Sequence, residues 1–491
     1  MTISDINKLS REELTESFLV LFDQYSQLQR MVYGQRRERF ISEPMPLPNL
    51  FDQNNLFQAS PELIKEKITY ERNKPQKRNH KGRQLLSQCT HLPVERVELP
   101  MQQDISGMTR IGESVQEKIA FKPGVLYIKH YVRTKYVDPN QEKIVIADPV
   151  AEPIAKCEAD ISLINYILVS KFVDHLPEYR IGEILKRAGL KIPSSTMNDW
   201  THGTIKTLLP LSKYLLNQLK STGYVQVDET RIRVQDGERE NSTHLGYMWY
   251  YYSPEQKIVV INYEQNRGRE GPTNILKHYT GYIQTDGYEV YKSIAKANPA
   301  IIHVGCMVHL RRYFEQALDN DNQRAGYILD QIQMLYAIEQ SLRDDNASYA
   351  NRFAVRKTLA QPILENIHTK IQEYSLTAIP KTLLGKAVTY GLNNWPAIER
   401  YITNGRLEID NNLVENKIRP IALGRKNFLF AGSHEAAERL AVIYSITGTC
   451  KANDVNPSDY LTWLLPKIND AKITELHLYT PMAYKKLFPN S

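Results

Sequence analysis

Two short segments of this chain share one pattern, in which strand-forming residues run directly into an aspartate. The first is residues 224–228 (YVQVD), whose aromatic and β-branched residues suit a pleated, half-buried surface. The second is residues 281–286 (GYIQTD), which Gly287 follows as a turn residue. Each segment predicts a buried strand that ends on a carboxylate, and this pair constrains the fold more than any other feature of the chain.

The elements around these two segments occur in an informative order. Three consecutive strands come first, and helices and strands alternate after them. This order is typical of an RNase H-like domain, in which the first two acidic residues lie on neighbouring strands, so we expect Asp228 and Asp286 to lie side by side. The predicted elements are strands at 224–228, 247–252 and 257–263, a helix at 272–279, the strand before Asp286, a helix through Tyr291 and Ile294, and a strand at 301–304.

A third carboxylate, Glu415, lies in the segment 408–416 (EIDNNLVEN). Asp410 is the expected N-cap of a helix, and Glu415, one turn inside it, can face the two aspartates. Such a set suits a two-metal phosphoryl-transfer site, because Mg²⁺ prefers oxygen ligands and paired ions stabilise both the attacking and the leaving oxygen. Two other glutamates compete for a metal. Glu229 is expected on the opposite face of its strand, and Glu408 is expected to be exposed.

Each carboxylate also has an ordinary structural explanation. Asp228 can cap a turn, and Asp286 precedes a glycine as turn residues do. Glu415 can pair with Arg419 four residues further along a helix. Together, in this order of elements, the three carboxylates outweigh their separate explanations.

Length and composition restrict the class of protein. With 491 residues the chain is expected to form three or four domains, and 42% hydrophobic residues are enough for globular folding. The formal net charge of +7 is small, so local basic clusters matter more than the sum. Four cysteines without paired spacing (Cys89, Cys157, Cys306 and Cys450) favour a reducing compartment. Because the N-terminus is polar and no apolar run is as long as a membrane span, we expect a soluble intracellular protein.

The N-terminal part of the chain combines a heptad pattern with a basic segment. Apolar residues within 11–33 recur at alternating steps of four and three, as in a coiled coil, so residues 1–40 predict a zipper helix. That helix would either pack on its own chain or form a short dimer. Residues 41–91 are expected to be a basic linker. Its run of six basic residues, which includes Lys77 and Arg78, would be a solvated tether or lie along DNA phosphates.

Residues 92–150 predict a small β-rich module, because apolar and polar residues alternate there. From 151 to 222 the period becomes helical. A helix, a turn at Gly189 and a second helix with a Ser/Thr cap form a helix-turn-helix pattern. A three-helix structural bundle gives the same pattern. The candidates for contact with DNA are Ser194, Ser195, Thr196, Asn198 and Asp199.

Beyond His309 the pattern becomes almost entirely helical. Residues 315–404 predict a helical insertion between two parts of the RNase H-like core, 223–314 and 405–450. A helical tail at 451–491 completes the expected multidomain α/β architecture. Basic residues that a phosphate backbone would favour follow Glu415, namely Lys417, Arg419, Arg425 and Lys426.

Several longer motifs resemble one known family. The phrases QVDET, QTDGY, CMVHLRRYF, LEIDNNLVEN and IRPIALGRKNFLFAGS are similar to those of the insertion-sequence-66 family of DDE transposases, in its large subunit. The similarity continues through SKFVDHLPEYR and SITGTCKANDVNPSDYL. Upstream, VYGQRRERF resembles the zipper segment of that family and GRQLLSQCTHLPVERV resembles its linker. The resemblance therefore covers nearly the whole chain.

The resemblance implies that Asp228, Asp286 and Glu415 form a catalytic triad holding two Mg²⁺ or Mn²⁺ ions, for hydrolysis at the ends of a mobile element and then strand transfer. His309 would lie near the scissile phosphate as a hydrogen-bond donor or proton carrier, unless it is a buried structural histidine. Cys306 would be a packed small apolar residue. The implied partners are double-stranded DNA with terminal inverted repeats, target DNA, further copies of the chain as a homodimer or higher oligomer, and small accessory transposition proteins. No membrane is implied, and the expected location is the bacterial cytoplasm at the nucleoid.

One stretch departs from the family pattern. The family carries a zinc-binding module with two C-x-x-C pairs, whereas the corresponding positions here are Met101, Asp104, Asp138 and Gln141. These are not the ligands of a thiolate zinc site, so we expect the module to keep its strands and to bind no zinc. Two rival functions are a non-catalytic DNA-binding regulator derived from a transposase and an RNA–DNA hybrid nuclease. The intact triad argues against the first, and the zipper, helix-turn-helix and insertion argue against the second.

Overall fold

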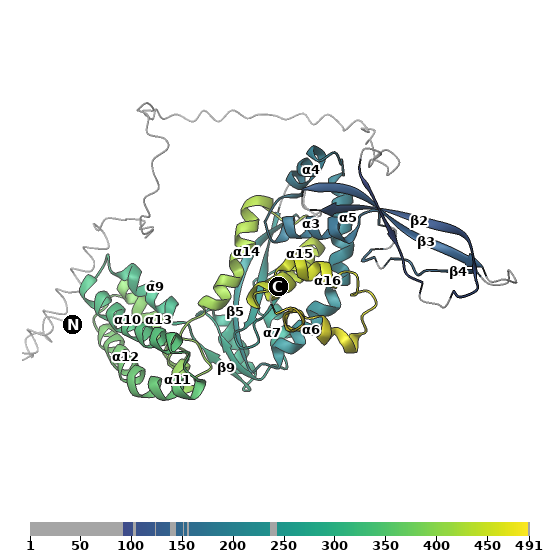
Figure 1. The fold of residues 1–491 in the computed structure, drawn as a ribbon. Helices are drawn as coiled ribbons and strands as arrows, with labels where there is room; N and C mark the ends of the chain where they lie inside the picture. Colours follow the sequence, from purple (N-terminus) through teal and green to yellow (C-terminus); the bar gives the residue numbers. More distant parts are fainter. Residues whose placement is uncertain are drawn as a thin grey trace, which may run out of the picture.

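The computed structural model describes residues 92–101, 105–122, 124–137, 144–150, 152–154, 157–235 and 243–489 (Figure 1). The predicted zipper helix and the basic linker with Lys77 and Arg78 lie outside these residues. So do Asp104, Asp138 and Gln141, three of the four positions that correspond to zinc ligands in the family. The described chain forms two β-sheets that pack against helices.

The centre of the molecule is a five-stranded sheet in the order β7-β6-β5-β8-β9. The strands β5, β6 and β7 form antiparallel pairs, while β8 and β9 run parallel to β5. This confirms the predicted order of three strands followed by alternating helices and strands, the order of an RNase H-like domain. The elements are β5 (Tyr224–Gln235), β6 (Thr243–Ser253), β7 (Ile258–Glu264), α7 (Glu270–Leu276), β8 (Gly281–Gln284), α8 (Glu289–Ala297) and β9 (Ile301–Val304).

The first strand of this sheet is longer than predicted. We expected it to end at Asp228 and the next strand to begin at Tyr247, but β5 continues to Gln235 because β6 pairs with it over its whole second half. In contrast, β8 pairs with β5 only from Tyr224 to Gln226. Asp228 therefore lies inside β5, just beyond the point where its parallel neighbour ends.

Helices cover both faces of the central sheet (Figure 1). The helices α14 (Asn412–Phe428) and α15 (His434–Ala452) pack on the face that carries Asp228 and its register partner Tyr250. The helix α8 packs on the other face, where the ring of Tyr291 lies 6.0 Å from that of Trp249. Asp228 and the start of α14 therefore share one face of the sheet.

The outer edge of the sheet is also bonded to α15. The hydroxyl of Thr449 accepts the N–H of Val259 at 3.1 Å, and the hydroxyl of Ser445 accepts the N–H of Ile261 at 2.8 Å. The Thr449 hydroxyl in turn donates to the carbonyl of Val259 at 3.0 Å. Backbone groups that β7 would otherwise present to solvent are thus bonded to a helix.

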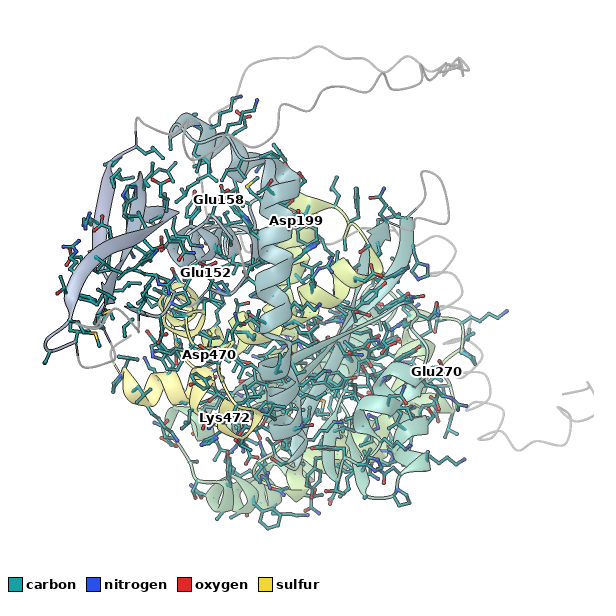
Figure 2. All side chains as sticks on the ribbon, turned by 90° about the vertical axis from the view of Figure 1, so that its right-hand side faces the viewer. Glu152, Glu158, Asp199, Glu270, Asp470 and Lys472 are labelled. Carbon is teal, nitrogen blue, oxygen red and sulfur yellow. The ribbon has the colours of Figure 1, made fainter. Side chains whose placement is uncertain are left out.

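Four strands between residues 94 and 146 form a second sheet that projects from the body of the molecule (Figure 1). Strands were expected at 94–99 and 125–133, and β1 and β3 occupy these positions. Lys118 is buried at the base of the sheet and pairs with Glu152 at 2.5 Å. Glu152 and Glu158 lie where the sheet meets the helices (Figure 2). The strands are β1 (Val94–Glu98), β2 (Thr109–Lys122), β3 (Val125–Val137) and β4 (Ile144–Ile146).

A group of helices joins the second sheet to the central one. The predicted helix, turn and helix are present as α4 and α5, and Gly189 in the turn has a φ of 94°, which suits glycine. The predicted Ser/Thr cap is wrong, because Pro193 is the N-cap residue of α5 and makes no side-chain hydrogen bond. Buried Met197 and Trp200 anchor α5, which also packs against α15. These helices are α3 (Ile161–Phe172), α4 (Glu178–Arg187), α5 (Ser194–Thr207) and α6 (Leu209–Lys220).

The stretch after β9 is helical, as predicted, and forms a bundle with its own apolar core beside the sheet (Figure 1). At its centre Arg356 is fully buried and binds Glu339 through two hydrogen bonds of 2.7 Å each. The limits of an independently folding insertion stay a prediction. The elements are α9 (Met307–Ala317), α10 (Asn322–Asp344), α11 (Tyr349–Val355), the π-helical turn η2 (Arg356–Ala360), α12 (Gln361–Ser375), α13 (Leu383–Ile398) and the 3₁₀ turn η3 (Glu399–Thr403).

The C-terminal segment consists of α16 (Pro457–Leu464), the 3₁₀ turn η4 (Ile473–Tyr479) and α17 (Pro481–Leu487). It packs back on the core, and the side chain of Asn165 in α3 donates to the carbonyl of Ser458 at 2.8 Å. In the part of the chain that the structure describes, no helix is both long and apolar enough to cross a membrane.

Candidate active site

Two aspartates meet where β8 ends. Gln226 is opposite Gln284 in the parallel pair, so the same register, continued by two residues, brings Asp228 opposite Asp286. Asp286 follows β8 in a tight turn, in which its Oδ1 accepts the N–H of Tyr288 at 2.9 Å. The register thus brings together two carboxylates that are far apart in the sequence, as we expected.

The carboxyl group of Asp228 lies where a negative charge is unfavourable. Burial, together with the charges of Glu229, Asp286 and Glu415, raises its pKa from the ordinary value of 3.8 to about 8. The N–H of Glu229, which donates to Oδ1 of Asp228 at 2.8 Å, acts in the opposite direction. Like charges shift a pKa in this way when they share a site. Asp228 therefore has Asp286 and Glu415 as close electrostatic neighbours.

Two arginines lie beside Asp286. Burial raises the pKa of Asp286, whereas the positive charges of Arg267 and Arg312 lower it. Arg267 is held by two hydrogen bonds to Oε1 of Glu229, at 2.6 and 2.9 Å, and lies 4.1 Å from the centre of the Tyr288 ring. Arg312 projects from α9 and is exposed. Neither arginine was expected at the site from the sequence. Arg312 lies within the motif CMVHLRRYF, which was the one available signal.

Glu415 lies in the first turn of α14, as predicted, and this helix packs on β5. Its Oε1 is buried and has no hydrogen-bond partner. Among the ion pairs of the described residues, none joins Glu415 to Arg419, the structural alternative that we considered. A buried carboxylate oxygen without a donor is costly, and a cation beside it would remove that cost.

The N-cap of the Glu415 helix differs by one residue from the prediction. The cap is Asn411, whose side chain makes no capping hydrogen bond to α14, and not Asp410. Asp410 precedes it, and its Oδ1 accepts the N–H of Asn412 at 3.0 Å. Its Oδ2 accepts the hydroxyl of Tyr336 from the helical bundle at 2.8 Å. The start of α14 is therefore tied to the bundle as well as to the sheet.

The two competing glutamates have other partners. Oε2 of Glu229 accepts the hydroxyl of Tyr291 at 2.8 Å, in addition to the bonds from Arg267. Glu408, which we expected to be exposed, is not, because Arg352 lies 3.0 Å away and covers it, and only 17% of its side chain is exposed. Arginine partners thus occupy both carboxylates, which leaves Glu415 as the third acidic group facing Asp228.

His309 lies in the first turn of α9, close to Glu415 and Arg312. Burial and the charge of Arg312 lower its pKa, so it is neutral at pH 7, and its Nδ1 is buried without a partner. Cys306 is 1% exposed, burial raises its pKa to about 12, and its Sγ accepts the N–H of Asn411 at 3.3 Å. Cys306 is therefore a packed thiol, as expected. The geometry of His309 fits both of the roles considered for it.

The residues at this site fit a divalent cation that prefers oxygen ligands. A cation nearby would lower the raised pKa of Asp228 and would give the unbonded Oε1 of Glu415 a partner. Among the described residues, no three His, Cys, Asp or Glu side chains are close enough to hold a metal ion by themselves. Mg²⁺ commonly keeps several waters and binds through one or two carboxylates together with substrate phosphates. The carboxylate oxygens present here therefore fit the chemistry of such an ion, which does not need three protein ligands.

The residues predicted to contact DNA lie in different settings. Ser194, Ser195 and Asp199 of α5 are exposed, and Figure 2 shows Asp199 on this helix. Thr196 and Asn198 are partly buried. Ser194 and Asn198 also line a pocket together with the segment 427–433. The start of α5 thus faces the end of α14 across a hollow and does not stand free on all sides.

The two basic residues predicted at the end of α14 also differ from each other. Arg425 is partly buried, and its guanidinium donates to the carbonyl of Arg231 on β5. Lys426 is exposed. Of these two residues, Lys426 is therefore the one that presents its charge to solvent.

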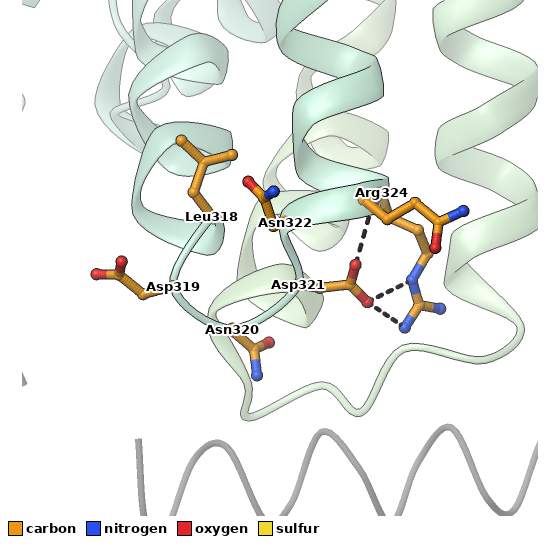
Figure 3. A pocket seen from close by; sticks show the side chains of 7 residues that line it. Leu318, Asp319, Asn320, Asp321, Asn322 and Arg324 are labelled. Carbon is orange, nitrogen blue, oxygen red and sulfur yellow. Dashed lines mark hydrogen bonds and ion pairs between the residues drawn. The ribbon is translucent and has the colours of Figure 1, made fainter. Parts of the chain in front are cut away.

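The loop between α9 and α10 lines another pocket and contains two aspartates (Figure 3). Oδ1 of Asp321 accepts the N–H of Arg324 at 3.0 Å, and Oδ2 accepts from Nε of Arg324 at 2.7 Å. Asp321 therefore caps α10 and forms an ion pair with Arg324 in the first turn of that helix. This acidic loop is explained by helix capping and is not a rival to the site at Asp228.

A sheet in the order β7-β6-β5-β8-β9, with acidic residues gathered where β5 and β8 part, is the arrangement of RNase H-like nucleases and polynucleotidyl transferases. Comparison with known families agrees. The profile of the Transposase IS66 family matches residues 156–439, and that of the IS66 C-terminal element matches residues 445–481. The chain belongs to the IS66 family of DDE transposases.

Similar proteins occur in Sinorhizobium fredii (strain NBRC 101917 / NGR234). The chain is 29% identical to uncharacterized protein y4qI over 80% of its own length and 75% of that protein. It is 26% identical to uncharacterized protein y4jD over 96% of both chains. It is also 26% identical to uncharacterized protein y4hP, over 78% of its own length and 72% of that protein. The similarity to y4jD thus extends over nearly the full length.

Proposed function

We propose that this transposase binds the ends of a mobile DNA element and catalyses metal-dependent strand cleavage followed by strand transfer, with Asp228, Asp286 and Glu415 as the catalytic carboxylates. The convergence of these three groups carries the proposal, because the charges of Asp286 and Glu415 both act on the pKa of Asp228. DDE transposases use divalent metal ions, and Mg²⁺ or Mn²⁺ bound here would activate the attacking oxygen and stabilise the leaving one.

The chain's own residues orient the reaction. The N–H of Glu229 and the N–H of Tyr288 each hold one oxygen of an aspartate, which fixes how the two carboxylates face the substrate. The exposed Arg312 beside Asp286 would pair with a DNA phosphate. His309, neutral and with an unbonded Nδ1, would donate to or accept from a group at the scissile phosphate.

The finer parts of the predicted function belong to this proposal as well. Terminal inverted repeats and target DNA would be the DNA partners, with α5 and Lys426 contributing contacts. Assembly through the segment 1–40 and help from small accessory proteins would complete the active complex. The module at 92–150 would serve without zinc. The domain boundaries stated for the sequence are part of the same proposal.

The test is cleavage of duplex DNA that carries the terminal repeats. Asp228→Asn, Asp286→Asn and Glu415→Gln should each lower cleavage more than about 100-fold, because residues that only support metal ligands already cost 10–100-fold. DNA binding in a mobility-shift assay should persist. The control Asp470→Asn, at an exposed position in the C-terminal segment (Figure 2), should cleave normally. Undiminished cleavage by any of the three triad variants would refute the assignment of that residue.

A further inference from the structure

Two glutamines occupy the same place relative to the two aspartates. Gln226 and Gln284 each lie two residues before an aspartate. Because side chains alternate along a strand, Gln226 and Asp228 lie on the same face of β5, and Asp286 follows Gln284 at the same spacing just beyond the end of β8. Both side chains are fully buried, and the two residues are register partners. Nε2 of Gln226 donates to Oε1 of Gln284 at 3.0 Å, and the hydroxyl of Tyr224 donates to the same oxygen.

This amide pair binds the segment that leads into the Glu415 helix. Nε2 of Gln284 donates to the carbonyl of Glu408 at 2.7 Å, and Nε2 of Gln226 donates to the carbonyl of Asp410 at 3.0 Å. The N–H of Glu408 donates to the hydroxyl of Tyr224 at 3.2 Å. The segment is thus attached to the two strands that carry the aspartates.

Gln226 also replaces a missing helix cap. The N–H of Val414 belongs to the first turn of α14, where backbone donors have no partner within the helix. The N-cap residue Asn411 does not supply one, but Oε1 of Gln226 accepts this N–H at 3.1 Å. Glu415 is the next residue in the chain. The side chain of Gln226, two residues before Asp228, is therefore hydrogen-bonded to the backbone of Val414, one residue before Glu415.

We propose that Gln226 and Gln284 are positioning residues, which set the place of Glu415 relative to Asp228 and Asp286. This inference rests on the proposed catalytic role of those three carboxylates. Packing alone does not need two amides here, since apolar side chains of the same shape fill a buried site at little cost. The amides instead fix the register between a helix and two strands, which apolar contacts do not specify.

The test is Gln226→Met, which keeps the length of the side chain and removes its hydrogen bonds. We expect half-maximal cleavage to require about 10–100-fold more Mn²⁺ than the parent protein requires, as found for groups that support metal ligands. Direct Mn²⁺ binding to the protein–DNA complex, measured by electron paramagnetic resonance, should weaken in parallel, while KM for DNA stays unchanged. Gln226→Asn, which keeps an amide but is one methylene shorter, should give a smaller shift in the same direction. It serves as the test variant if Gln226→Met does not fold.

The matched control is Asn165→Leu. Asn165 is also a buried amide, and its Nδ2 makes three hydrogen bonds, two to Ser458 and one to Thr462, away from the carboxylates. This variant should lose thermal stability but keep the Mn²⁺ dependence of the parent per folded molecule. If the folded Gln226 variant keeps that dependence too, the positioning role is wrong. An active Glu415→Gln would instead refute the proposed function, so the two failures are distinguishable.

Discussion

Replacing Asp228 by asparagine should stabilise the metal-free protein at pH 8 and do so much less at pH 5. The folded protein holds the pKa of this carboxyl at about 8, against 3.8 for an ordinary aspartate. Because the pKa is higher in the folded state, the folded protein still binds this proton at pH values where the unfolded chain has released it. The contribution of Asp228 to the free energy of unfolding is therefore greatest below about pH 4, and it decreases progressively as the pH rises to 8. Asparagine cannot ionise and avoids the loss.

The size of the effect follows from the pKa. At about 1.4 kcal/mol per pH unit, ionisation of Asp228 costs about 5 kcal/mol by pH 8 but only about 2 kcal/mol at pH 5. The advantage of Asp228→Asn over the parent should therefore grow by up to about 4 kcal/mol between these two pH values. For a protein of this size that corresponds to a difference in Tm on the order of 5 °C.

Scanning calorimetry in the presence of a chelator measures this difference directly. Titratable groups remote from Asp228 behave alike in both proteins and cancel in the comparison, so the difference reports Asp228 together with the carboxylates that its charge affects. The exposed control Asp470→Asn should follow the parent at both pH values. Added Mn²⁺ at pH 8 should raise the Tm of the parent more than that of Asp228→Asn, since binding to the folded state stabilises it. A Tm difference that is the same at pH 5 and pH 8 would show that burial and charge do not perturb this carboxyl.

Three further perturbations test other parts of the structure. In Gly287→Ala the new Cβ would lie 2.6 Å from Cε2 of Tyr390, so the turn that holds Asp286 or the Tyr390 ring beside it must shift, and DNA cleavage should fall at least about tenfold; adding Tyr390→Ala should restore part of it. Glu339→Leu leaves the fully buried Arg356 without its carboxylate and should destabilise the helical bundle by about 3–5 kcal/mol, visible as a lower Tm and faster proteolysis. Lys426→Ala should weaken binding to DNA of any sequence and reduce the slope of log K against log salt by about 0.9, and an unchanged slope would exclude a phosphate contact.

The order of strands and helices along the chain could be predicted because strand-forming and helix-forming residues mark each element locally. The meeting of Asp228 with Asp286 was expected from that order, which is typical of an RNase H-like domain. The extent of β5 differs from the prediction. Its second half alternates polar residues with the buried Ile232 and Val234, and β6 pairs with it as far as Gln235.

The surroundings of the third carboxylate depend on contacts that no local pattern contains. Glu408 was expected to be exposed because it precedes the helix. Its partner Arg352 lies in the helical bundle, 56 residues earlier, so the sequence around Glu408 does not indicate this contact. The cap of α14 was assigned to Asp410 because capping was sought within the helix's own sequence, whereas Gln226 on a distant strand bonds its first turn. The sequence contains a glutamine two residues before each of the two aspartates. That these glutamines contact each other follows only from the register of β5 with β8.

The bonding of β7 to α15 limits how copies of this protein can assemble. Sheets commonly join across subunits when an outer strand offers free backbone donors and acceptors to a second chain. Here Ser445 and Thr449 already engage those groups on Val259 and Ile261. A second copy of the chain would have to displace α15 before it could extend the sheet on this side. Any contact between copies would therefore use other surfaces of the molecule.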